Sequence, residues 1–220
     1  MAHNPGEFAA FKRFQDFAPT RYFAIYDFDP LETDIISEAL GGGTAAIANQ
    51  NVGGGVRRYT TGTTNGQYAQ AYVIADVGRP ADNAVFEWRV RVAPTGTLTG
   101  NRCLLQATDV NQAGLDSAYF DFDQSVSANW LAGSTSDAVS YTITTTSVVV
   151  VANTWVTLRI ETSTANVKYY IDGVLVATHT TNIPTSTVAL GLYNYQDKVS
   201  STGAKSHDID FMRVGTTRLA

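Results

Sequence analysis

The sequence predicts an all-β protein built from antiparallel strands in a sandwich or barrel. Short segments that alternate polar and apolar residues follow one another closely, with glycine- or proline-containing turns between them. The 220-residue chain is 44% hydrophobic, contains 11 tyrosines and has only 16% charged residues, a composition that favours strands. A single domain of this size can bury a sizeable core, and no alternation of strands with long helices indicates a parallel fold.

The one helix that the sequence predicts lies at the N-terminus. Asn4 is a helix-capping residue, Pro5 suits the first helical position and Glu7 follows the cap by three residues, so we expect a short helix over residues 5–17. Four phenylalanines recur every three residues on one broad face: Phe8, Phe11, Phe14 and Phe17. Residues 1–20 are therefore expected to form a helical arm, and residues 21–220 the sandwich domain.

The arm has two possible docking sites. It can pack on its own sandwich and close one end, or it can dock on another subunit through its phenylalanines, which are typical interface anchors. Each phenylalanine contributes about 1.5–3 kcal/mol when it is fully buried, so either arrangement is substantial.

Strands are predicted along the rest of the chain before residue 155. They cover residues 22–28, 56–60, 67–74, 85–92, 102–108, 117–122, 140–145 and 148–151. In residues 85–92, Phe86 and Trp88 are expected to face inward, opposite Glu87 and Arg89. Two glycine triplets interrupt residues 31–55, so we expect a loop or a bulged strand there.

The clearest hairpin lies between residues 155 and 178. Residues 155–161 alternate apolar and polar side chains with the period of a half-buried strand. Two further strands, 167–171 and 174–178, are separated by Asp172 and Gly173. Because these two residue types tolerate positive φ, they predict a type I′ turn. Strands over residues 188–193 and 208–214 complete the domain.

Several of these features together resemble the concanavalin A-like lectin/glucanase superfamily. They are the strand that begins at Trp155, the hairpin at residues 170–173, the turn at residues 183–184 and the closing strand. The resemblance covers residues 84–214 and implies an antiparallel two-sheet jelly-roll sandwich. Members of the superfamily include lectins, glycosidases, lyases, laminin G-like adhesion modules and virus-particle proteins, so the resemblance leaves function open.

Charge and hydropathy exclude several classes of protein. The net charge is −5 with four lysines and no basic run, which argues against nucleic-acid binding. No apolar segment approaches the ~18 residues of a membrane span, and no secretory signal is present in the first thirty residues. The lone cysteine, Cys103, cannot form an intramolecular disulfide and is expected to be a buried small hydrophobe.

No catalytic constellation is found, so we expect a protein that is not an enzyme. Three pairs of aspartates have the spacing that places two carboxylates on one face of a strand: Asp27/Asp29, Asp121/Asp123 and Asp208/Asp210. Such pairs can in principle hydrolyse a glycosidic bond. The glucanases of the superfamily, however, carry a Glu-x-Asp-x-(x)-Glu run, which this sequence lacks. Solvated or turn-forming carboxylates are the preferred interpretation.

Histidines and acidic loops offer no firm cofactor or metal site. His3, His179 and His207 are the only histidines, and none has the spacing of a zinc ligand pair or lies in a lyase-like motif. Loops after Asp109 and at Asp116 could bind a structural calcium, although such loops usually serve turn geometry. We expect no cofactor and no metal.

Two groups of aromatic and amide residues are candidates for glycan binding. Trp130, and the run Tyr193, Asn194 and Tyr195, can supply rings that stack on a sugar and an amide that binds its hydroxyls. The alternative is that these aromatic residues form edges of the core.

The function expected from these observations is structural. We expect a virion protein, such as a bacteriophage capsid decoration or fibre-type protein, made in the host cytoplasm. Its arm and sheet edges would contact other virion proteins of the capsid or tail and other copies in a homo-oligomer. The alternative is a lectin-like module that recognises a surface glycan, and the third hypothesis is a glycan-active hydrolase or lyase.

Overall fold

The computed structural model describes residues 20–26, 36–49, 55–73, 78–109, 116–136, 139–200 and 202–217. Within these ranges the protein has 15 strands and a 3-10 turn, Pro80–Asp82. No helix among the described residues is long and apolar enough to cross a membrane. The predicted helix over residues 5–17, with its four phenylalanines, lies outside the described residues.

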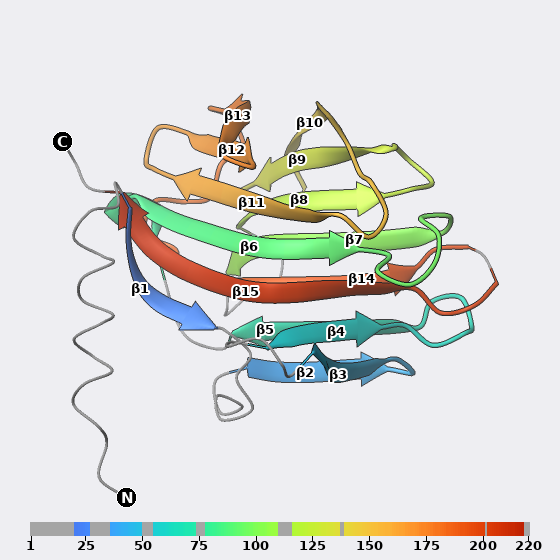
Figure 1. Cartoon of the computed structure of the whole chain (residues 1–220). Coiled ribbons are helices and arrows are strands. Elements are labelled where there is room, and N and C mark those ends of the chain that lie inside the picture. The colour runs from blue at the N-terminus through green and yellow to red at the C-terminus, as the bar shows by residue number, and fades with distance from the viewer. Residues whose placement is uncertain are drawn as a thin grey trace, which may run out of the picture.

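The strands form two antiparallel sheets that lie face to face (Figure 1). Sheet A has the order β13-β12-β11-β6-β15-β4-β3, with β1 also paired to β15. Its strands are β1 (Thr20–Tyr26), β3 (Thr44–Asn49), β4 (Val56–Thr60), β6 (Ala84–Val92), β11 (Trp155–Thr162), β12 (Val167–Ile171), β13 (Val174–His179) and β15 (Ser206–Thr217).

Sheet B has the order β10-β9-β8-β7-β14-β5-β2. Its strands are β2 (Ile36–Gly41), β5 (Tyr68–Val73), β7 (Asn101–Asp109), β8 (Ser117–Asp123), β9 (Asn129–Thr135), β10 (Tyr141–Val149) and β14 (Leu190–Lys198). The late strands β14 and β15 insert between early strands of their sheets. The predicted antiparallel two-sheet jelly-roll sandwich is thereby confirmed.

The core lies between the sheets and follows the alternation of the strands. Phe86 and Trp88 of β6 are fully buried, as predicted. From sheet B, Leu105 and Phe120 belong to the same buried cluster. Cys103 of β7 also points inward, and burial raises the pKa of its thiol well above the usual value, so it is the inert small hydrophobe that the sequence predicts.

The predicted hairpin turn is confirmed in detail. Asp172 and Gly173 have φ values of 48° and 79°, the positive values that a type I′ turn requires at both central positions. Asp172 also accepts a hydrogen bond from the backbone N–H of Thr157 at 2.8 Å through its Oδ1. The side chain therefore fastens the turn to the neighbouring strand β11.

Three parts of the sandwich differ from the sequence-based expectation. Strand β9 was not predicted, because Ala132, Gly133 and Ser134 give it a weak hydrophobic signal. Residues 140–145 and 148–151, expected as two strands, belong largely to the single strand β10, whose pairing with β9 becomes irregular between Thr145 and Val149. The glycine-rich region 31–55, expected as a loop or a bulged strand, contains two strands, β2 and β3, and the register of β3 with β4 shifts between Ile47 and Asn49.

Candidate functional site

The outward face of sheet B carries a group of tyrosines on three of its strands, β5, β14 and β8. We call this group the tyrosine face, and it consists of Tyr68, Tyr72, Tyr119, Tyr193 and Tyr195. On β5, the alternation places tyrosine outward and the fully buried Ala69 and Ala71 inward. The registers place Tyr72 opposite Tyr193, and Tyr193 opposite Gln106 of β7. Gln106 in turn lies opposite Tyr119 of β8.

The tyrosine rings of β14 and β5 contact one another. The rings of Tyr193 and Tyr195 are stacked, with centroids 6.2 Å apart and an interplanar angle of 14°. Tyr68 lies against the other side of this pair, 5.6 Å from Tyr195. The hydroxyl of Tyr193 donates a hydrogen bond to Gln70 Oε1 at 2.8 Å. A half-buried aromatic strip with an amide at its side thus crosses two strands.

Two of the rings lie across glycines of the adjacent strand. A Cβ atom added at Gly133 would be 2.1 Å from Tyr119 Cζ, and one added at Gly41 would be 2.3 Å from Tyr68 Cε1. Each ring therefore occupies the space above a glycine that any other residue would fill. This arrangement lays the rings of Tyr119 and Tyr68 down across the sheet, where both residues are half-buried.

A polar centre adjoins the rings. Arg102 of β7 donates hydrogen bonds to Asp121 of β8 from Nε at 3.3 Å and from Nη2 at 3.1 Å. Asp123 and Asp197 are the direct cross-strand neighbours of Arg102, so three carboxylates surround this one cation. Burial raises the pKa of Asp121, and the Arg102 guanidinium opposes that rise.

The hydroxyls of Tyr119, Tyr193 and Tyr195 keep their protons at neutral pH. Burial, with a smaller effect of the nearby Asp121, raises the pKa of Tyr119 to about 12. Burial also raises the pKa of Tyr193 and of Tyr195. These hydroxyls can therefore both donate and accept hydrogen bonds.

The structure separates the residues that the sequence proposed for glycan binding. Tyr193 and Tyr195 lie on the tyrosine face. Asn194, between them, points into the core, where it is fully buried with Nδ2 3.9 Å from Met212 Sδ. Trp130 is 1% exposed, because β9 turns it inward against Phe120. Neither Asn194 nor Trp130 is accessible to a glycan, and Trp130 takes the alternative role, a place in the core.

Sequence reasoning missed most of the tyrosine face. The signal is present in residues 68–72, where tyrosine and glutamine alternate with alanine. A pattern of period two predicts that these residues divide between two faces, but it does not say which face is buried. Large tyrosines next to small alanines suggest tyrosine in the core, whereas the structure places the alanines there.

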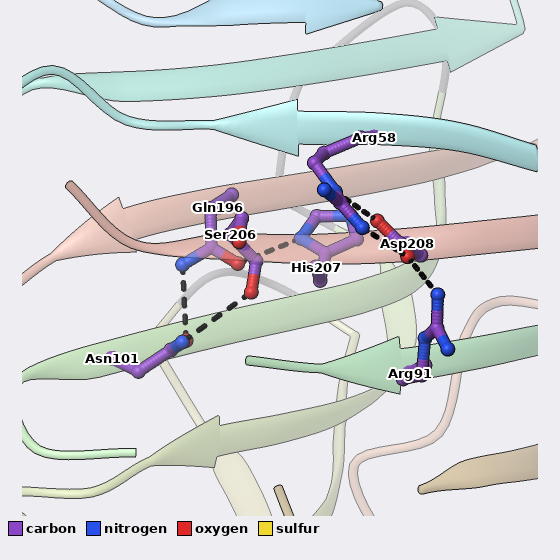
Figure 2. Close-up of polar contacts among 7 residues, drawn as sticks. All are labelled: Arg58, Arg91, Asn101, Gln196, Ser206, His207 and Asp208. Carbon is purple, nitrogen blue, oxygen red and sulfur yellow. Dashed lines mark hydrogen bonds and ion pairs between the residues drawn. The ribbon is translucent and has the colours of Figure 1, made fainter. Parts of the chain in front are cut away.

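A second polar cluster, inside the sandwich, joins the sheets (Figure 2). His207 of β15 is fully buried, with its ring 5.3 Å from that of Tyr59 and Nδ1 2.7 Å from Gln196 Oε1 of β14. The Gln196 amide donates to Asn101 Oδ1 at 3.0 Å, and the Asn101 amide donates to the Ser206 carbonyl at 3.5 Å. The chain of hydrogen bonds returns to β15 and holds the two sheets in register.

Asp208, the next residue, lies on the outer side of β15 and is not solvated as expected (Figure 2). Its carboxylate is fully buried. Arg58 donates to both oxygens, at 2.7 and 2.9 Å, and Arg91 donates to Oδ2 at 2.6 Å. The two arginines cover the carboxylate and link β15 to its neighbours β4 and β6.

The remaining carboxylate candidates also have structural partners. Asp210 pairs with Arg89 at 2.8 Å on the partly exposed outer face of sheet A. Asp123 Oδ1 accepts hydrogen bonds from the backbone N–H and the hydroxyl of Ser125, at 2.9 and 2.6 Å, which is the turn-forming role expected. Asp27 and Asp29 lie outside the described residues.

His179 occupies a buried hydroxyl cluster between the sheets. Its Nδ1 lies 2.9 Å from the Ser134 hydroxyl and its Nε2 3.0 Å from the Thr144 hydroxyl. Both ring nitrogens are therefore engaged, and burial lowers the pKa of the imidazole. The cluster ties β13 to β9 and β10, and the serine is fully buried.

The loop proposed as a calcium site lies only partly within the described residues, which include Asp109 and Asp116. Asp116 Oδ1 accepts a hydrogen bond from the backbone N–H of Thr185 at 2.5 Å, which shapes the loop before β8. Residues 110–115 lie outside the described part of the chain. Among the residues that are described, no three His, Cys, Asp or Glu side chains gather into a metal site.

Comparisons with known proteins agree with this architecture. A family described as SO2946-like, C-terminal domain, matches residues 51–211. No curated protein matches the chain in sequence. The β-glucanase of Bacillus licheniformis superposes with a TM-score of 0.65 at 14% identity, over 92% of this chain and 100% of that one.

Two further solved structures share the fold. The protein of unknown function SO2946 from Shewanella oneidensis MR-1 has a TM-score of 0.64 and 15% identity, over 100% of this chain and 98% of that one. The carbohydrate-binding module CBM66 from Bacillus subtilis has a TM-score of 0.54 and 12% identity, over 83% of this chain and 98% of that one.

At these identities the structural likeness shows the fold alone, which is the concanavalin A-like jelly roll that the sequence resemblance implies. The sequence match goes further, because it covers more than two thirds of the chain. The chain therefore belongs to the SO2946-like, C-terminal domain family.

Proposed function

We propose that this chain is a carbohydrate-binding domain that holds a glycan on the tyrosine face. The observation that carries the proposal is the cluster of tyrosine rings on one outward sheet surface, two of which lie along the sheet over glycines. Aromatic surfaces of this kind stack on the C–H faces of sugar rings, and neighbouring polar groups bind the hydroxyls. The β-glucanase and the carbohydrate-binding module, named for their action on or binding to carbohydrate, add support through the shared fold.

The residues divide into stacking and hydrogen-bonding roles. Tyr195 and Tyr193 would form the central stacking surface, since their rings are already stacked on each other. Gln70 and the Arg102–Asp121 pair would bind sugar hydroxyls on either side. Because the Tyr193–Gln70 and Arg102–Asp121 contacts exist in the free protein, little side-chain ordering is needed on binding.

Binding without catalysis is part of the proposal. A hydrolase requires one carboxylate that donates a proton and a second that acts as nucleophile or base. Asp121 is held by both Nε and Nη2 of Arg102, and Asp123 Oδ1 is engaged by Ser125 in a turn. We therefore expect a bound oligosaccharide to remain intact, which product analysis by mass spectrometry after prolonged incubation can check.

A place on a virus particle is the weaker interpretation. It depends on the arm at residues 1–20, whose residues 1–19 lie outside the described structure, and none of the compared proteins supports it. A lectin-like module that recognises a surface receptor would use the tyrosine face in the same way. Carbohydrate binding therefore comes first, and the abundance of the chain on purified particles tests the virion hypothesis separately.

A glycan array with matched variants tests the proposed function. We expect the wild-type chain to bind a defined set of glycans and Tyr193→Ala to lose that binding by at least about tenfold, ~1.4 kcal/mol. Tyr170→Ala is the control, because Tyr170 is a half-buried tyrosine on the opposite sheet, where it donates a hydrogen bond to Glu161. Absence of any glycan binding, or equal loss in both variants, would overturn the proposal.

A further inference from the structure

Strand β10 ends sheet B and lacks the charges and prolines that usually protect an edge strand. It pairs with β9 and is the last strand in the order of the sheet. The sequence has no charged residue, proline or glycine from residue 138 to residue 158. Edge strands in natural proteins are normally guarded by charges, prolines or strong bulges, because an open edge can pair with another chain.

The outward side chains of this edge are apolar and exposed. Ile143 is 57% exposed and Tyr141 51%, and Val139, just before the strand, is 81% exposed. The polar partners of β10 point the other way. Thr142 Oγ1 donates to the Thr181 carbonyl at 3.0 Å, and the Thr144 hydroxyl lies 3.0 Å from His179 Nε2. The apolar residues are thus left on the surface, while the hydroxyls fasten β10 to sheet A.

The neighbouring edge of sheet A has the same character. Strand β13 ends sheet A and lies beside β10, so that both layers of the sandwich end on the same side of the molecule (Figure 1). Val174 and Leu175 at the start of β13 are exposed. An uncharged, partly apolar surface therefore extends over the ends of both sheets.

An irregularity limits which part of β10 can pair with another strand. Register with β9 is regular from Tyr141 to Thr145 and then shifts before Val149. Thr146 fills the irregular part, where its hydroxyl donates to the Trp130 carbonyl at 2.8 Å and accepts from the Val148 backbone N–H at 3.3 Å. The five-residue segment before it keeps a regular register with β9 and can therefore extend the sheet.

We propose that two copies of this chain pair through residues 141–145 of β10. Antiparallel pairing of identical segments about a twofold axis is self-complementary, with Ile143 opposite Ile143 of the partner subunit and Tyr141 opposite Thr145 of the partner subunit. Each 7-stranded sheet B then continues into the other.

Charge favours a second copy at this edge. Each chain carries a net charge of −5, so two copies repel each other over most of their surfaces. The uncharged segment 138–158 is a place where they can approach without like charges meeting. The twofold axis stands perpendicular to the sheet, and the outward faces of the two copies of sheet B therefore point the same way.

Sedimentation of the full chain tests this pairing. We expect wild-type protein to sediment as a dimer, twice 23.7 kDa, and Ile143→Lys to weaken dimerisation by at least about tenfold because two lysines would meet at the axis. The control is Val126→Lys, since Val126 is 69% exposed in the turn after β8, away from the edge. This variant should dimerise like the wild type.

A cross-linking variant fixes the register independently. Directly opposite residues of antiparallel strands have Cβ atoms about 4.5–5.5 Å apart, so Ile143→Cys should form an intermolecular disulfide on mild oxidation, and Val126→Cys should not. A monomeric wild-type chain would overturn the proposal. A dimer that persists in Ile143→Lys and does not cross-link through position 143 would also overturn it. If Val174→Lys dissociates such a dimer, the copies pair through β13 instead, and the proposal is equally overturned. Neither result depends on whether the tyrosine face binds a glycan.

Discussion

His207 makes the stability of the sandwich depend on pH. Burial lowers the pKa of its imidazole to about 3, against the smaller opposing effect of Asp208. The neutral ring stacks on Tyr59 and is hydrogen-bonded to Gln196. In the unfolded chain the histidine takes up a proton near pH 6.5, whereas the folded protein resists protonation.

Acid therefore destabilises the folded protein through His207. The contribution of His207 is complete above about pH 6.5 and is lost as the pH falls toward 3, at about 1.4 kcal/mol per pH unit. We expect urea unfolding between pH 6.5 and 4.5 to show a smaller loss of stability in His207→Gln than in the wild type. An identical slope in the two proteins would contradict the assignment.

The two aspartates of β15 should differ sharply when they are neutralised. Asp208→Asn leaves Arg58 and Arg91 without the carboxylate that both contact, so we expect a loss of about 1–3 kcal/mol in the free energy of unfolding. Asp210→Asn removes only the partly exposed pair with Arg89 and should cost less than about 1 kcal/mol. Equal losses in chemical denaturation would contradict the described burial of Asp208.

At the scale of strands, the contact between β8 and β9 beneath Tyr119 is a sharp test of the site geometry. Gly133→Ala places a methyl group where the Tyr119 ring lies, and we expect it to cost about 1–3 kcal/mol in stability. Because the clash is with that ring, Tyr119→Ala in the same chain should remove most of the cost. Chemical denaturation of the two single variants and the double variant measures the coupling, and strictly additive losses would show that the ring lies elsewhere.

Strands and turns could be predicted from the sequence where neighbouring residues alone determine the backbone conformation. The hairpin at Asp172 and Gly173 follows from turn residues alone, and it has the expected positive φ values. Strand β9 could not be recognised in the same way, because its small and polar residues become buried only through pairing with β8 and β10. The irregular part of β10 likewise interrupts the sequence pattern, so one strand was predicted as two.

The candidate site was predictable only in part for a related reason. Alternation places Tyr193 and Asn194 on opposite faces. Which of the two faces is buried depends on how the strand packs against the opposite sheet, which the local pattern does not show. Arg102 and Asp121 are 19 positions apart, and their pairing requires the register of β7 with β8, which no local pattern gives. The tyrosine face as a unit is a property of the assembled sheet.

For the whole molecule, the charge around the tyrosine face predicts which glycans bind. Three carboxylates surround Arg102, and the entire chain is acidic. We expect neutral oligosaccharides to bind more tightly than polymers of uronic acid, and the difference to shrink at high salt because charge repulsion is screened. Affinity electrophoresis at low and high salt checks this prediction. Preferential binding of the polyanion would show that Arg102 is available to it.

The central claim is that the tyrosine face binds carbohydrate, and isothermal titration calorimetry of Tyr195→Ala tests it most directly. Tyr195 contacts both Tyr68 and Tyr193, so its loss breaks the middle of the aromatic strip. We predict that the variant remains folded and binds the best array glycan at least about tenfold more weakly than the wild type, while Tyr170→Ala binds unchanged. Wild-type affinity in a folded Tyr195→Ala variant would contradict the claim.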